Sequence, residues 1–227
     1  MSRPDLWRRC LAEGIGSCFL VVVVVGSGIA AQRMSPNDAG VQLLENAAVT
    51  AAGLAALIVA FGTVSGAHHN PVVTMADRCF GGLSTRDVAA YLPCQVVGGC
   101  AGAVLANTMF SEPALQLSHT ARTGGGHWTA EVVATVGLLL VVFGAARSHG
   151  RSVAPFAVGG YIGAADFFTS STSFANPAVT IARTLSNTFA GIEPASAPAY
   201  VPCQLLGLGR RHHPRAGAPP WHRKRGR

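Results

Sequence analysis

Asn-Pro-Val-Val-Thr at residues 70–74 returns as Asn-Pro-Ala-Val-Thr at residues 176–180, and this pair of segments decides the fold. Asn is a good helix N-cap and Pro suits the first helical position, so each segment begins a helix. Both helices are short, because one covers 70–78 before a Gly-Gly break and the other covers 176 to about 187. A membrane span needs roughly 20 apolar residues. We therefore predict two half-helices.

The rest of the chain has the composition of a membrane protein. Only 12% of its 227 residues are charged, whereas a soluble domain carries about 25%. Charge-free runs mark six candidate spans, the last of them short: 14–32, 46–71, 88–110, 132–146, 152–165 and 195–209. The first run is too long for a signal-peptide core and has no obvious cleavage site, so we interpret it as a retained span.

Three matched pieces indicate an internal repeat. Ala-Glu at 12–13 and 130–131 leads the first and fourth spans, and the Asn-Pro segments follow the second and fifth. Ala-Tyr-Leu-Pro-Cys-Gln at 90–95 and Ala-Tyr-Val-Pro-Cys-Gln at 199–204 open the third and sixth. Each unit thus holds three spans and one half-helix. Because each unit has an odd number of spans, the second unit crosses the membrane in the opposite direction to the first. Inverted repeats of this kind place a binding or conduction path at their interface, near the membrane midplane.

The two half-helices therefore predict a pore. Their N-termini carry partial positive charge and free N–H donors, which exclude cations and bind neutral polar solutes. One Asn-Pro pair alone would more simply be a capped helix in a loop, but two at matched places favour the pore. We predict an all-α membrane protein with a pore domain at 1–209. Its repeats cover about 9–110 and 127–209, and a basic, disordered tail follows at 210–227.

These residues resemble the aquaporin and glycerol-facilitator family, also called major intrinsic proteins, over about residues 10–208. Ser-Gly-Ala-His-His-Asn-Pro-Val at 65–72 is similar to the first signature, with Val72 where Ala is usual, and Phe-Ala-Asn-Pro-Ala at 174–178 is similar to the second. The run 172–183 resembles the bacterial subgroup associated with arsenite permeation. The resemblance implies that Asn70 and Asn176 turn amide donors into the lumen. It assigns the pore motifs to Asn70, Pro71, Val72, Asn176, Pro177 and Ala178.

The resemblance also locates a selectivity filter. Many water-selective members have Arg directly after Asn-Pro-Ala, where this chain has Val179, and the other filter positions fall near Thr50, Asp166 and Ser173. None is the Phe or His that narrows a water filter. We therefore predict a wide filter for glycerol-like molecules and metalloid hydroxides such as arsenite, with water as a further solute. Asp166 lies either in this filter or at the wet outer end of the fifth span, and we favour the second of these two places.

Glu13 and Glu131 occur at matched positions, which indicates a buried role. The resemblance implies that they accept backbone N–H groups around the half-helix loops. No metal, cofactor or catalytic residue is expected: six cysteines lack metal-ligand spacing, and His68 and His69 lack partners. An enzyme is not expected, because no nucleophile–base set or phosphate loop is visible.

The second copy diverges after Gln204. Leu-Leu-Gly-Leu-Gly at 205–209 gives way to an Arg-, His-, Pro- and Gly-rich segment unsuited to hydrocarbon. We therefore expect a truncated sixth span. A reading-frame change is our preferred explanation, a tail that binds anionic headgroups is the second, and a tail that binds nucleic acid nonspecifically is the third. The alternative function is accordingly a nonconducting remnant or assembly partner of such a channel.

Lys and Arg in short loops set the orientation. Arg3, Arg8 and Arg9 precede the first span, and further arginines lie in the loops on the same side, whereas the tail accounts for the whole +7 net charge. Both termini are predicted to be cytoplasmic in a multi-pass protein of the inner membrane. The expected partners are the lipid bilayer, small neutral solutes and, if folded, three further copies in a homotetramer, with no specific nucleic acid.

Overall fold

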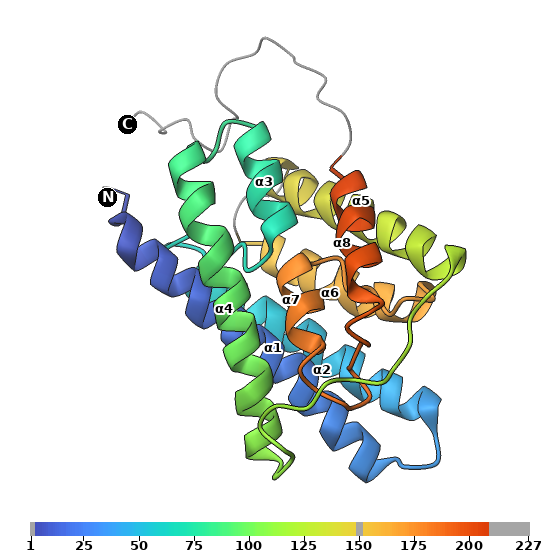
Figure 1. The fold of residues 1–227 in the computed structure, drawn as a ribbon. Helices are drawn as coiled ribbons and strands as arrows, with labels where there is room; N and C mark the ends of the chain where they lie inside the picture. The colour runs from blue at the N-terminus through green and yellow to red at the C-terminus, as the bar shows by residue number, and fades with distance from the viewer. Residues whose placement is uncertain (1–2, 149–151, 209–227) are drawn as a thin grey trace.

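The computed structural model describes residues 3–148 and 152–208. Within them the chain forms eight α-helices (Figure 1). In order they are α1 (Leu6–Met34), α2 (Ala39–Phe61), α3 (Pro71–Cys79), α4 (Thr85–Met109), α5 (Gly125–Ser148), α6 (Ala154–Phe168), α7 (Pro177–Arg183) and α8 (Ala197–Leu206). Four of these, α1, α2, α4 and α5, are long and apolar enough to cross a membrane. The predicted tail at 210–227 lies outside the described residues.

The half-helices α3 and α7 begin where their Asn-Pro pairs predict. The side-chain oxygen of Asn70 accepts a hydrogen bond from the Val72 N–H at 2.9 Å, and that of Asn176 accepts one from Ala178 at 3.0 Å. Two helix boundaries differ from the prediction. The second charge-free run is helical only to Phe61, because the chain then enters the loop that leads to Asn70. Helix α7 ends at Arg183 and not near residue 187, because the chain turns back there.

The helices pack as two related groups around the half-helices. Helix α1 lies along α4 and α2, while α5 contacts α6 and α8. The α1–α4 contact is close because Gly98 and Gly102 face the backbone carbonyls of Gly14 and Cys18, with no room for a side chain. In Figure 1, α3 and α7 lie between these long helices, and they also contact one another.

The two copies differ most in their last helix. Helix α4 has 25 residues and continues past Gln95 along α7, whereas α8 has 10 residues and ends two residues after Gln204. Helix α8 contacts α5 and α7. In the described part of the chain, α3 packs against α4 of its own copy, but α8 does not pack along α3 as α4 packs along α7.

The outer faces of the long helices are apolar. On α1 the exposed side chains recur every four residues, at Trp7, Leu11, Ile15 and Phe19. This spacing puts them on one helix face. Such a face suits contact with lipid or with another copy, because either of them keeps the apolar side chains away from water.

Candidate pore and selectivity region

The two half-helices are joined where they meet. The amide nitrogen of Asn70 donates to the Ala175 carbonyl at 2.8 Å, and that of Asn176 donates to the His69 carbonyl at 2.8 Å. Each asparagine thus caps its own helix with its oxygen and ties the opposite loop with its nitrogen. Both residues are 5% exposed. One hydrogen on each amide remains for a passing solute, since an amide nitrogen carries two donors.

The loops that precede the half-helices share an unusual backbone. Ala67 and His69 have φ angles of 50° and 46°, and Ser173 and Ala175, at the matched positions, have 46° and 44°. Left-handed conformations of non-glycine residues cost of order 1–3 kcal/mol each and persist only where the surroundings impose them. Two different loop sequences therefore adopt one strained shape, which requires strong supporting contacts.

Glu13 supplies these contacts in the first copy. Its carboxylate accepts the His68 and His69 N–H groups at 3.0 and 2.7 Å, the Ser65 hydroxyl at 2.6 Å and the Gln95 amide at 2.7 Å. The side chain is fully buried. All four hydrogen bonds are donated to the carboxylate, so they stabilise its negative charge without a neighbouring arginine or lysine.

Glu131 has similar surroundings in the second copy. It accepts the Phe174 and Ala175 N–H groups at 3.0 and 2.9 Å and the Gln204 amide at 2.6 Å. Gln204 lies in α8, so the short helix still contributes its part to this loop. The two glutamates thus hold the two strained loops in equivalent ways.

Sequence reasoning missed the roles of four residues in this network. The Gln95 and Gln204 amides donate onward to the hydroxyls of Thr74 and Thr180, each at 2.9 Å. Those hydroxyls donate to the backbone carbonyls of Asn70 and Asn176. All four residues belong to segments that recur in the repeat. Their recurrence as polar residues in apolar surroundings was a signal that could have identified them.

The predicted filter residues come from four different segments. Thr50 lies in α2, Asp166 in the last turn of α6, Ser173 in the second loop and Val179 in α7, and each is between 4% and 6% exposed. The hydroxyls of Thr50 and Ser173 have no hydrogen-bond partner in the described part of the chain. Asp166 is near the end of its helix but is largely enclosed by the bundle.

Two arginines near these residues were not recognised from the sequence as part of the site. Arg122, in the loop between α4 and α5, donates to the carbonyls of Gly191 and Phe189 at 2.9 and 3.2 Å. Burial lowers the pKa of its guanidinium below the usual arginine value. Arg183, at the end of α7, donates to the Ala190 carbonyl. The guanidinium carbons of both lie over the Phe174 ring, at 5.3 and 3.5 Å from its centroid.

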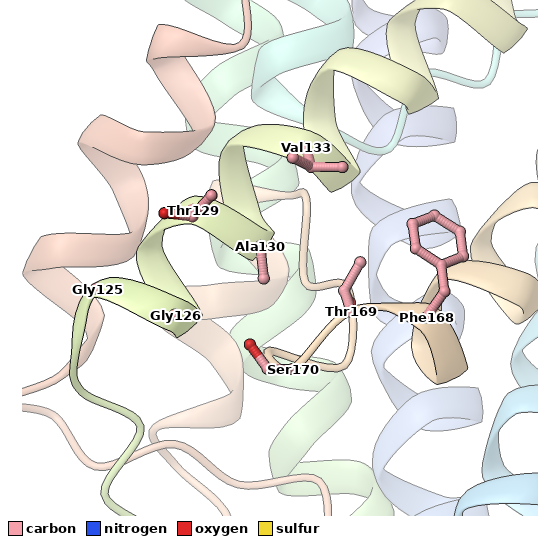
Figure 2. Close-up of a pocket in the computed structure, with 8 residues that line it drawn as sticks. All are labelled: Gly125, Gly126, Thr129, Ala130, Val133, Phe168, Thr169 and Ser170. Atoms are coloured by element: carbon pink, nitrogen blue, oxygen red, sulfur yellow. The ribbon is translucent and has the colours of Figure 1, made fainter.

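A hollow of about 520 Å³ opens beside this region, between the first turns of α5 and the end of α6 (Figure 2). Thr129, Ala130 and Val133 line one side, and Phe168, Thr169 and Ser170 line the other. Neither asparagine of the pore motifs lines it, so the hollow is distinct from the junction of the half-helices.

Metal-binding geometry is absent from the described residues, which contain no cluster of three or more His, Cys, Asp or Glu side chains. The six cysteines are all free thiols. His69 is fully buried against Gly16 and the Phe61 ring, and His68 approaches the Thr74 hydroxyl at 3.2 Å. The two histidines therefore point to different neighbours, as residues adjacent on a loop commonly do.

Comparison with known proteins agrees with this architecture. The family model for major intrinsic proteins matches residues 1–174. The chain is 46% identical over 207 residues to aquaglyceroporin AqpS of Rhizobium meliloti, covering 91% of this chain and 88% of the relative. It is 33% identical over 108 residues to a glycerol uptake facilitator of Pseudomonas aeruginosa, covering 48% and 38%.

A solved structure shares the fold. The aquaglyceroporin of Plasmodium falciparum superposes with a TM-score of 0.69 at 17% identity, covering 90% of this chain and 94% of that one. The family model and the relatives above show that the chain belongs to the major intrinsic proteins, which are membrane channels and not enzymes.

Proposed function

We propose that this chain is a passive channel for small neutral hydroxylated molecules such as glycerol and arsenite. The observation that carries the proposal is the buried junction of two half-helices, at which Asn70 and Asn176 each keep one amide hydrogen for a solute. Helix N-termini meeting there disfavour cations. The names of the two relatives, aquaglyceroporin and glycerol uptake facilitator, support glycerol as one of the solutes.

We propose Thr50, Asp166, Ser173 and Val179 as lining residues of the constriction. Valine in place of arginine at position 179 leaves more room for a solute larger than water. Thr50 and Ser173 each add a hydroxyl to this set, and both hydroxyls are enclosed and have no hydrogen-bond partner in the described residues. Glycerol and metalloid hydroxides match such a surface, because each of their hydroxyl groups both donates and accepts hydrogen bonds.

We further propose that the protein is a homotetramer of the inner membrane with both termini in the cytoplasm. The arginine distribution supports the orientation, and the apolar outer faces of the long helices support contact between copies. The sixth span is proposed to be truncated, since α8 ends at Leu206 and a basic segment follows in the sequence. That same observation favours a second candidate function, a nonconducting remnant or assembly partner.

Flux measurements separate these two functions. The purified full-length chain is reconstituted into lipid vesicles, and shrinkage or swelling is followed by stopped-flow light scattering with water, glycerol and arsenite. We expect glycerol and arsenite flux well above that of empty vesicles. Flux equal to empty vesicles for all solutes, with the protein folded and inserted, would reject the channel and favour the remnant.

A further inference from the structure

An arginine, Arg183, lies near Val179, the position at which many water-selective family members have arginine. Val179 and Arg183 are four residues apart in α7 and therefore lie on the same face of that helix. Helical side chains lean toward the helix N-terminus, so a long residue covers the turn before its own Cα. The N-terminus of α7 is the junction of the two half-helices. Arg183 therefore reaches from the end of α7 back toward the level of Val179.

Neighbouring groups hold the Arg183 guanidinium in a defined place. Its Nε donates to the Ala190 carbonyl, and its central carbon lies 3.5 Å from the centroid of the Phe174 ring. The residue is only 5% exposed. Within the described residues its two terminal nitrogens have no hydrogen-bond partner, yet they are not sealed from solvent. On the proposed channel function, the space that these nitrogens face belongs to the pore.

Asp166, on another helix, is a hydrogen-bond acceptor that complements the donors of Arg183. It lies in the last turn of α6, is 6% exposed, and its carboxylate oxygens keep contact with solvent. Its charge and that of Arg183 influence one another electrostatically, but the ion pairs of the described residues join other side chains. Arg183 thus offers open donors and Asp166 open acceptors, on two different helices of the same bundle.

The other charged groups near Arg183 and Asp166 already have hydrogen-bond partners in the protein. Arg122 directs its donors at the carbonyls of Gly191, Phe189 and Ser171. Glu131 accepts the backbone N–H groups of the second loop. Arg183 and Asp166 are thus the two charged residues of this region whose polar ends remain open to a solute.

We propose that Arg183 is the cation of the selectivity region and that it forms, with Asp166, a two-sided site for neutral polyhydroxy solutes. The guanidinium donates to a solute oxygen, and the carboxylate accepts a solute hydroxyl. A sodium ion is repelled by the first group and an organic anion by the second. This inference rests on the proposed channel function and names two residues that select its solutes.

The main test removes the positive charge and measures ions as well as glycerol. Arg183→Gln keeps a polar side chain but leaves Asp166 as an uncompensated carboxylate. We expect sodium leak from reconstituted vesicles to rise by roughly tenfold, the order of effect of one unit charge a few ångströms away in a wet site. Glycerol flux should fall but stay measurable, because glutamine still offers a donor to a solute oxygen. Ion exclusion unchanged from wild type in a glycerol-conducting Arg183→Gln protein would overturn the proposal.

The complementary variants test the role of Asp166 and cover the case in which Arg183→Gln does not fold. Asp166→Asn leaves the guanidinium uncompensated, so formate leak should rise while sodium remains excluded. In the double variant both leaks should return to the wild-type level. A formate leak in Asp166→Asn no greater than in wild type, or a sodium leak that persists in the double variant, contradicts the paired site.

Arg33→Gln is the matched control, because Arg33 lies at the outer end of α1 and bonds Phe110 and Glu112 away from the pore. Its ion exclusion and glycerol flux should equal those of wild type. Equal losses of every flux in Arg183→Gln and Asp166→Asn would indicate a purely structural role and overturn the proposal. Absence of glycerol flux in wild type would instead reject the channel function itself.

Discussion

The buried glutamates are the residues on which the pore geometry most depends. Each accepts two backbone N–H groups from a loop with left-handed residues. Hydrogen bonds to a charged group contribute about 1.5–3 kcal/mol each. Several such bonds on one carboxylate offset the strain of the loop. A fully buried carboxylate is tolerated here because it is completely surrounded by donors.

Glu13→Gln and Glu131→Gln should therefore lower stability and flux. Glutamine has the same shape, but its NH₂ group faces donors and leaves at least one buried N–H without an acceptor. We expect a loss of about 2 kcal/mol or more, seen as a lower thermal midpoint in detergent and a lower yield of folded protein. Wild-type yield and flux in both variants would contradict the assignment.

Glu112→Gln is a suitable control for these variants. Glu112 pairs with Arg33 at the surface, where 33% of the Glu112 side chain and 51% of the Arg33 side chain are exposed. An exposed ion pair contributes about 0–1 kcal/mol. Its removal should leave both the thermal midpoint and glycerol flux close to wild type.

At the scale of elements, glycines determine how closely the helices approach. A Cβ on Gly102 of α4 would lie 2.2 Å from the Cys18 carbonyl oxygen of α1. The obstacle is backbone, which cannot rotate away as a side chain can. Gly207 of the second copy is at the position matched to Gly98, and a Cβ there would meet Thr135 of α5 at 2.8 Å. Close approach of the last helix is thus common to both copies.

Gly102→Ala should accordingly destabilise the protein by about 1–3 kcal/mol, the usual cost of inserting a methyl group into a packed interface. Gly160→Ala is the control, since a Cβ on Gly160 meets nothing within 4 Å and alanine is the better helix former. Thermal unfolding in detergent should separate the two variants. A Gly102→Ala protein as stable as Gly160→Ala would show that α1 and α4 can move apart without cost.

Arg122 connects elements that are distant in sequence. Its guanidinium bonds carbonyls in the segment after α7, and its backbone N–H bonds the Ser196 hydroxyl before α8. Arg122→Lys keeps the charge but replaces a planar group of five donors by a single ammonium. We expect faster proteolysis or hydrogen exchange in residues 184–196, with the helices unchanged. Equal protection in this segment would contradict a connecting role.

At the scale of the whole molecule, the two copies of the repeat differ in the last helix of the described residues, which has 25 residues in α4 and 10 in α8. Helix α4 covers α7 along its length, while α8 ends before it could cover α3 in the same way. The half-helix α3 instead reaches α5 through Phe80 and Phe143, whose ring centroids lie 4.8 Å apart. Stability should therefore be limited by the α3 and α5 side of the bundle.

A chimera tests this asymmetry. Residues from Leu205 onward are replaced by a copy of residues 96–107, the continuation of α4 after Gln95. If the added turns pack on α3 and α5, the thermal midpoint should rise by about 5 °C, equivalent to roughly 1–2 kcal/mol for a chain of this size. An unchanged or lower midpoint would show that the second copy needs no such helix.

The sequence alone determined the architecture and the residues at the pore junction. Matched Asn-Pro, Ala-Glu and Pro-Cys-Gln segments are local patterns, and their order implies inverted symmetry whatever the details of packing. What only the tertiary structure decided is which side chains face one another. Arg183 meets Phe174 and Ala190 because the chain folds back after α7. Asp166 belongs to another helix, α6, and no local pattern encodes where its carboxylate lies relative to the Arg183 guanidinium.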